Sequence, residues 1–155
     1  MTLEFVDLMA KFGEKIGLPD LRPEDDSCYV EIDGMPVSFM EHGNSKSLVT
    51  WADVCDVPPG DGAGLSRILM EAMYMGRETD GSTFSIESGS GKIVLHRIDP
   101  LVTLDLDAFC AMLEKFVNVL EKWRDFIAGY HEDARNDDNG TSGDSSSFGG
   151  GFIQV

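Results

Sequence analysis

A glycine-rich stretch, residues 58–70 (PPGDGAGLSRILM), is the first part of the sequence whose residue types could perform chemistry. Glycines that lead into a helix can hold a phosphate, because the free N–H groups of a helix N-terminus point at the anion. The stretch departs from the dinucleotide pattern G-x-G-x-x-G, since Leu65 stands where the last glycine is required. In residues 88–93 (SGSGKI), Ile93 replaces the Ser or Thr of a Walker loop. Both stretches are interpreted as turns, and no cofactor is predicted.

The acidic segment near the end of the sequence has the composition of a calcium loop but not its ligand pattern. When Gly140 is aligned with the turn glycine of an EF-hand loop, the first ligand position is Arg135 and the twelfth is Ser146. Calcium loops require oxygen ligands at these positions, with a bidentate carboxylate at the twelfth. No metal ion is therefore predicted.

Nucleophilic chemistry would need a thiol and an imidazole held together by the fold. The candidates are Cys28, Cys55, Cys110, His42, His96 and His131. They show neither metal-ligand spacing nor a nucleophile motif, although a pairing of Cys28 with His42 or His96 stays open. We predict no catalytic residue and no enzyme, with a cysteine-dependent enzyme kept as an alternative. Three cysteines without close spacing also indicate reduced thiols.

Composition and charge limit the partners that the protein can have. Among its 155 residues, 28 Asp and Glu stand against 12 Lys and Arg, which gives a net charge of -16. Such a surface repels nucleic acid and anionic lipid, and it favours basic or polar partners. No apolar run approaches the roughly 20 residues of a membrane span, and the start of the sequence shows no signal peptide. We therefore expect a cytoplasmic protein without nucleic-acid binding or membrane insertion.

Apolar spacing in the first half of the sequence predicts a helix followed by three strands. Residues 3–16 carry apolar side chains at helical intervals. Two short β-rich runs then flank Asp33 and Gly34, a pair typical of a two-residue hairpin turn. A third strand follows and ends at a Pro-Pro pair. Val30 and Ile32, on one face of the first strand, are assigned to the core.

The second half of the sequence predicts a helix, a hairpin and a last helix. The helix covers 65–76, the hairpin strands cover 84–87 and 92–98, and the last helix begins after Asp105 as N-cap and ends at Gly129. The order is therefore α-βββ-α-ββ-α. Since hairpins pair strands antiparallel, the predicted fold class is α+β, with helices packed on one antiparallel sheet.

The composition changes after the last predicted helix. Residues 129–155 are rich in Asp, Asn, Ser and Gly, which favours a flexible acidic tail behind a domain of residues 1–128. Within the tail, β-propensity is confined to residues 151–155 (GFIQV). We hypothesise that this segment mimics a partner strand and occupies a groove of this or a neighbouring molecule.

The middle helix is apolar nearly all round. A helix buried on every side in so small a domain requires a partner besides its own sheet, so we predict a homodimer. The first helix has a similar excess of apolar residues, and an exposed patch of this kind marks a binding surface.

The element order and several motifs resemble the class I type III secretion chaperones, the Tir chaperone family. The resemblance covers about Leu3 to Ile127. It rests on GLPDL after the first helix, the hairpin CYVEIDGMPVSF, the helix LSRILMEAMYMG and the closing LEKFVNVLEKWRDFI. The span from Leu69 to Phe109 is its most specific part, because helix, glycine turn, hairpin and last helix follow in the family's order and spacing.

The resemblance implies a small, acidic, cytosolic bacterial homodimer without enzymatic activity. Such proteins bind the chaperone-binding segment near the N-terminus of a secreted effector in extended form. They keep the effector soluble and competent for export, and release it at the secretion ATPase. The leading alternative is an acidic adaptor, unrelated to secretion, that captures a basic partner by charge alone.

On this interpretation, apolar residues form two predicted surfaces. The dimer interface is predicted at Ile68, Leu69, Ala72, Met73, Met75 and Val94. Effector contacts are predicted at Phe5, Leu8, Met9, Phe12, Val37, Phe39 and Trp51.

Overall fold

The computed structural model describes residues 2–42, 45–58 and 62–140. Its elements follow the predicted order, and the α+β class is confirmed. The helices are α1 (Leu3–Ile16), α2 (Gly62–Met73) and α3 (Leu106–Gly140), with short 3₁₀ turns η1 (Tyr74–Gly76) and η2 (Leu101–Thr103). The strands are β1 (Ser27–Ile32), β2 (Met35–His42), β3 (Ser47–Asp56), β4 (Thr83–Glu87) and β5 (Lys92–Pro100).

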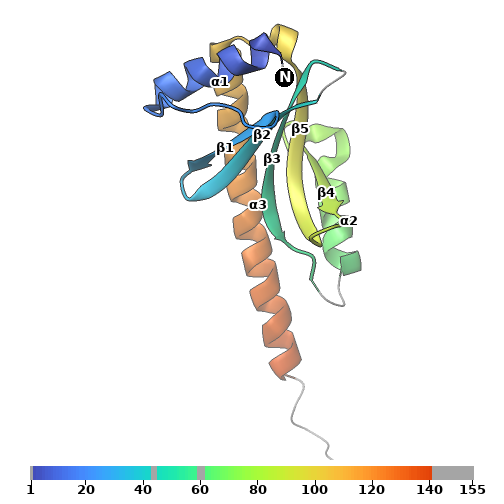
Figure 1. The fold of residues 1–155 in the computed structure, drawn as a ribbon. Helices are drawn as coiled ribbons and strands as arrows, with labels where there is room; N and C mark the ends of the chain where they lie inside the picture. The colour runs from blue at the N-terminus through green and yellow to red at the C-terminus, as the bar shows by residue number, and fades with distance from the viewer. Residues whose placement is uncertain (1, 43–44, 59–61, 141–155) are drawn as a thin grey trace, which may run out of the picture.

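The five strands form one antiparallel sheet in the order β1-β2-β3-β5-β4 (Figure 1). The strands β1 and β4 are therefore its two edges. The turn between β1 and β2 consists of Asp33, with φ of 50°, and Gly34, with φ of 76°. Both residues take the left-handed conformation that this type of two-residue turn requires, so the predicted hairpin is confirmed.

The two faces of the sheet have different surroundings. Along β2 and β3, buried residues alternate with half-buried or exposed ones, because successive side chains of a strand point to opposite faces. The inner face includes Val37, Phe39 and Leu48 and belongs to the core. The outer face includes the half-buried Trp51 and the exposed Tyr29, and it is the accessible side of the sheet.

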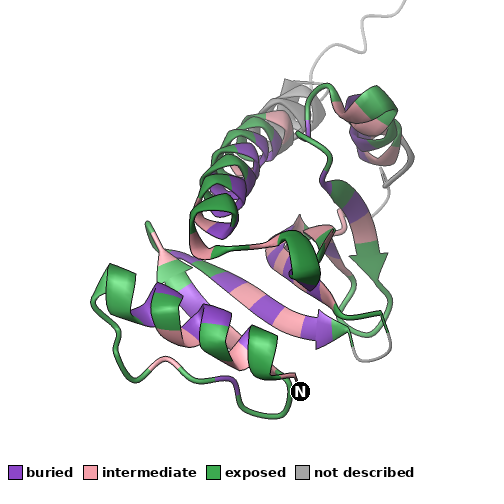
Figure 2. Cartoon of the chain, turned by 90° about the horizontal axis from the view of Figure 1, so that it is seen from above, coloured by how far each residue is buried: buried purple, intermediate pink, exposed green. Residues whose placement is uncertain are grey.

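The helices α1 and α3 meet the inner face of the sheet around three phenylalanines. The rings of Phe12, Phe39 and Phe109 lie 5.0–6.1 Å apart in edge-to-face contact, a geometry that aromatic pairs prefer. Figure 2 shows the buried residues as stripes along α1 and α3. Val30 is buried and Ile32 packs against the core, so their assignment to the core is confirmed.

The helix α3 is longer than predicted. Its start is as expected, because Oδ1 of Asp105 accepts a hydrogen bond from the amide of Ala108 at 2.8 Å. The helix then continues through Gly129 to Gly140 and projects beyond the sheet (Figure 1). The prediction that Gly129 ends it is wrong, since a glycine inside a helix costs about 1 kcal/mol but does not break it.

This extension crosses the predicted boundary between domain and tail. The helix passes from residue 128 to residue 129 without interruption. Residues 141–155, which include the hypothesised GFIQV segment, lie outside the described residues.

The helix α2 lies beside β4 (Figure 1). The amide of Phe84 in β4 donates a hydrogen bond to Sδ of Met73 at 3.0 Å. The indole Nε1 of Trp123 in α3 donates to the carbonyl oxygen of Glu78 at 3.0 Å. The first bond connects α2 to the edge strand β4, and the second connects the segment after η1 to the middle of α3. Another side of α2 faces solvent, since Met70 is exposed.

Candidate functional site

The outer face of the sheet carries a row of aromatic and polar side chains across four strands. Tyr29, Ser38, Trp51 and His96 lie opposite one another in register. Tyr29 is 71% exposed, and Trp51 is half-buried. The structure therefore places Trp51, a predicted effector contact, on an accessible face.

A second row on the same face is apolar. Met40, Val49 and Ile98 lie opposite one another on β2, β3 and β5, and Ile98 is exposed. An apolar surface that the chain itself leaves open is typical of a site for another protein.

A cleft of about 580 Å³ opens beside the edge strand β1. One wall comes from the outer face of the sheet, and the other comes from the segment that precedes β1. Its lining residues are Asp20, Leu21, Arg22, Glu24, Asp25, Ser27, Cys28, Tyr29, Ser38 and Trp51. The cleft thus joins the aromatic row to a charged loop.

Carboxylates dominate the charge of this cleft. They belong to Asp20, Glu24 and Asp25. Among the lining residues, Arg22 carries the only positive charge. Its Nη1 donates hydrogen bonds to the carbonyl oxygens of Pro19 and Leu21, at 3.1 and 2.7 Å. The cleft therefore has an acidic excess, which favours a positively charged group.

A tight turn positions two of these carboxylates. The backbone of Glu24 exchanges hydrogen bonds of 2.8 and 3.0 Å with that of Ser27. Between them, Asp25 and Asp26 have φ of 47° and 67°, a left-handed conformation that aspartate enters more readily than most residues. The amide of Glu41 in β2 donates to the carbonyl oxygen of Asp26 at 3.0 Å, which fixes the turn to the sheet.

His96 ends the aromatic row as a neutral group at pH 7. Its Nδ1 lies 3.0 Å from the hydroxyl of Ser85. Burial lowers the pKa of His96 below its usual value of 6.5, because a partly desolvated imidazole disfavours the charged form. The side chain therefore adds a hydrogen-bonding group beside Trp51 without adding charge.

The second accessible apolar surface lies on α2 and the turn that follows it. Met70, Tyr74 and Met75 are 69%, 66% and 81% exposed. Ser66, Arg67 and Glu71 border the hollow that contains Met70 and Tyr74. Three large, exposed apolar side chains within six residues form a surface suited to another protein chain.

The residues predicted for the dimer interface have different exposures in the single chain. Leu69 and Ala72 are buried in the core, whereas Met75 is exposed. The half-buried residues are Ile68, Met73 and Val94. Val94 pairs with Asp53 on the outer face of the sheet, away from the helical positions. The interface itself stays a prediction, and its most accessible part includes Met70 and Tyr74, which the sequence analysis did not assign to it.

The residues predicted for effector contact are mostly core residues of the single chain. Those that are buried are Phe5, Leu8, Met9, Phe12, Val37 and Phe39. Their exposures are 5% or less, although Leu8 lines a cleft between the starts of α1 and α3. Trp51, which is half-buried, is more accessible than these residues, and the effector contacts stay a prediction.

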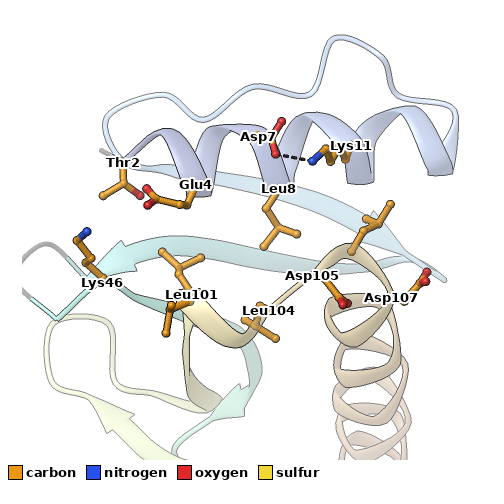
Figure 3. A pocket seen from close by; sticks show the side chains of 12 residues that line it. Thr2, Glu4, Asp7, Leu8, Lys11, Lys46, Leu101, Leu104, Asp105 and Asp107 are labelled. Atoms are coloured by element: carbon orange, nitrogen blue, oxygen red, sulfur yellow. Dashed lines mark hydrogen bonds and ion pairs between the residues drawn. The ribbon is translucent and has the colours of Figure 1, made fainter.

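A second cleft, of about 600 Å³, lies between the starts of α1 and α3 (Figure 3). Leu8, Leu101 and Leu104 supply apolar lining. Nζ of Lys11 lies 2.6 Å from Oδ2 of Asp7, an ion pair drawn as the dashed line in Figure 3. The rest of the charged lining consists of Glu4, Asp105, Asp107 and Lys46, so this cleft has an acidic excess as well.

Two of the three thiols have a raised pKa. Burial raises the pKa of Cys28 to about 11, and burial together with the charge of Asp56 raises the pKa of Cys55. In the described part of the chain, no group of three or more Cys, His, Asp or Glu residues is placed to hold a metal ion. None of the helices described there is long and apolar enough to cross a membrane.

The fold and its accessible surfaces define the class of the molecule, a small α+β domain suited to binding other proteins. Residues 7–124 match the model of the Tir chaperone protein (CesT) family. The match spans most of the chain, so the protein belongs to that family. No curated protein sequence matches the chain.

Solved structures with the same fold are complexes of two proteins. A chain of the ExsC-ExsE complex is 25% identical with a TM-score of 0.68, over 80% of this chain and 95% of that one. A chain of the HopA1-SchA chaperone-effector complex is 15% identical with a TM-score of 0.64, over 79% and 94%. A chain of the ExoT-SpcS complex from Pseudomonas aeruginosa is 15% identical with a TM-score of 0.62, over 79% and 99%. The fold that these matches share is the fold predicted from the sequence.

Proposed function

We propose that the protein is a type III secretion chaperone of the bacterial cytoplasm, without enzymatic activity. It binds the N-terminal chaperone-binding segment of a secreted effector in extended form and keeps that segment soluble for export. The observation that carries this proposal is the family match over residues 7–124. The chaperone-effector complex among the similar structures supports it.

The outer face of the sheet is the proposed site for the effector segment. The rows through Trp51 and Val49 offer apolar contacts, and the edge strand β1 offers backbone groups to an added strand. A disordered segment loses conformational entropy when it binds. A long, continuous surface offsets that loss, and the two rows together offer contacts on several neighbouring strands.

The accessible surface of α2 is the proposed dimer contact. Met70, Tyr74 and Met75 lie on or directly after this helix and are exposed in the single chain. A symmetric dimer buries the same patch of both copies, so one apolar surface per chain suffices. Two copies also double the surface over which an extended effector is bound.

Co-expression tests the proposal directly. The chain is co-expressed with the N-terminal segment of a candidate effector encoded by a neighbouring gene. The complex is purified and its molecular mass is measured. We expect a stable complex of two chaperone chains and one effector segment. Failure to obtain a complex with any effector encoded beside secretion-apparatus genes contradicts the proposal.

Salt distinguishes the chaperone from an acidic adaptor. At about 0.5 M salt the Debye length is only a few ångströms, so a complex held by charge alone dissociates. A complex held by the apolar rows of the sheet survives. Dissociation at this salt concentration therefore favours the adaptor.

A further inference from the structure

We infer that the cleft beside β1 binds a basic side chain, with arginine preferred, from the extended segment of the protein partner. The inference rests on the proposed function for the existence of such a segment. Beyond that function, it specifies the chemistry of one residue in the partner's segment and names the residues of this chain that select it.

The first argument is the shape of the aromatic row. Tyr29 and Trp51 stand on either side of Ser38 in register, and all three line the cleft. Neighbouring strands lie about 4.8 Å apart, so two strand spacings, about 10 Å, separate the Cα atoms of the two aromatic residues. The side chain of Ser38, between them, is small, so the cleft has room for a flat group that contacts an aromatic ring.

The second argument is charge. Asp20, Glu24 and Asp25 line the same cleft, and no ion pair engages their carboxylates within the described residues. Arg22 does not fill the space, because its Nη1 donates to two carbonyl oxygens of its own loop. Three carboxylates against one guanidinium leave the cleft with an acidic excess.

Together the two arguments select the guanidinium group. A guanidinium is planar, always charged, and stacks on aromatic faces while it donates hydrogen bonds to carboxylates. An ammonium group satisfies the charge but stacks less well. An anionic or acidic segment is repelled by the carboxylates.

Two capped peptides of identical shape test the inference. The first is acetyl-Thr-Val-Thr-Arg-Thr-Val-Thr-amide, and the second carries citrulline, the uncharged isostere, in place of arginine. Binding to the full chain is followed by the two tryptophan indole N–H signals in NMR. Trp123 is 6% exposed and bonded to Glu78, so its signal is an internal control, whereas Trp51 lines the cleft.

We expect the arginine peptide to shift the signal of Trp51 and to leave that of Trp123 in place. Its Kd should be about tenfold lower than that of the citrulline peptide at low salt, because cation–π contact and charge both favour arginine. Equal Kd values for the two peptides overturn the inference, and so does the absence of any shift of Trp51 at millimolar peptide.

A pair of matched variants separates the cleft from the general negative charge of the protein. The triple variant D20N/E24Q/D25N removes the three cleft carboxylates, and asparagine accepts the left-handed conformation of residue 25. The control E4Q/E114Q/E121Q removes three exposed carboxylates of α1 and α3. We expect the first variant to bind both peptides alike and the control to keep the tenfold preference.

The outcomes also separate this inference from the proposed function. Loss of the preference in both triple variants assigns it to net charge and overturns the inferred site for a basic side chain. The co-expressed complex reports on chaperone function independently, since apolar contacts on the outer face hold it. A stable complex with no arginine preference therefore contradicts the inference alone.

Discussion

At the scale of single residues, the raised pKa values of Cys28 and Cys55 predict slow reaction of these two thiols. With its pKa raised to about 11, Cys28 is almost entirely protonated at neutral pH, and the thiolate is the reactive form. We expect Cys28 and Cys55 to react with iodoacetamide at pH 7.5 more slowly than in the urea-unfolded chain, measured by mass spectrometry of tryptic peptides. A cysteine that is modified faster in the folded protein contradicts this and revives the enzyme alternative.

His96 makes the stability of the protein depend on pH. Its folded-state pKa is lowered by burial, so the unfolded chain binds more protons as the pH falls below about 6.5. Acidification therefore lowers the free energy of unfolding, because His96 takes up its proton more readily in the unfolded chain. This loss of stability begins near pH 6.5. It is complete only below the pKa of the folded state.

The variant His96→Gln isolates that contribution. Urea unfolding of the wild type and the variant at pH 7.5 and pH 5.5 gives four free energies of unfolding. We expect the wild type to lose more stability between the two pH values than the variant does, since glutamine does not titrate. Equal losses would show that His96 is protonated as easily in the fold as in the unfolded chain.

At the scale of elements, two helical glycines are expected to respond in opposite ways to the same change. A Cβ on Gly13 would lie 2.5 Å from the carbonyl oxygen of Leu18 and 2.8 Å from Cβ of Leu21, so Gly13→Ala forces the end of α1 to shift. A Cβ on Gly129 meets nothing within 4 Å, so Gly129→Ala gains helix propensity of up to about 1 kcal/mol.

Thermal unfolding followed by circular dichroism measures both changes. We expect Gly13→Ala to lower Tm and Gly129→Ala to raise it slightly. Each variant is the other's control, because the chemical change is identical. A rise in Tm for Gly13→Ala would mean that the loop after α1 adjusts without cost, and a fall for Gly129→Ala would mean that α3 ends at that residue.

The elements were predictable from sequence wherever a local signal determined them. Asp33 and Gly34 fixed one hairpin, and Asp105 fixed the start of α3, because the chemistry of a turn or a cap resides in one or two residues. The end of α3 was not predictable from Gly129, since a glycine lowers helix stability without setting a boundary.

The candidate site was only partly predictable, because apolar periodicity does not show what covers an apolar side chain. Phe5 and Phe12 are apolar in the sequence and buried in the fold. Val37 and Phe39 face the opposite side of the sheet from Trp51. This follows from the alternation of side chains along β2 and from the register between β2 and β3. The acidic side of the cleft comes from the loop before β1, whose position no periodic pattern reveals.

At the scale of the whole molecule, charge and apolar surface act in opposite directions. A net charge of -16 keeps single chains apart, whereas the exposed surface of α2 favours association. In the proposed dimer, the two copies pair where apolar contact exceeds the repulsion. High salt screens the repulsion, so dimerisation should strengthen as salt is added.

The surface of α2 can be altered without touching the core. The variant Met70→Glu/Tyr74→Glu places two charges on side chains that are exposed in the single chain, so the fold should persist while a buried interface would be destabilised by unpaired charges. We expect light scattering to give twice 17.0 kDa for the wild type and about 17.0 kDa for the variant. Val102→Glu, at a residue that is 87% exposed and far from α2 in sequence, should remain dimeric. A monomeric wild type contradicts the dimer, and a dimeric double variant moves the interface to another surface of the chain.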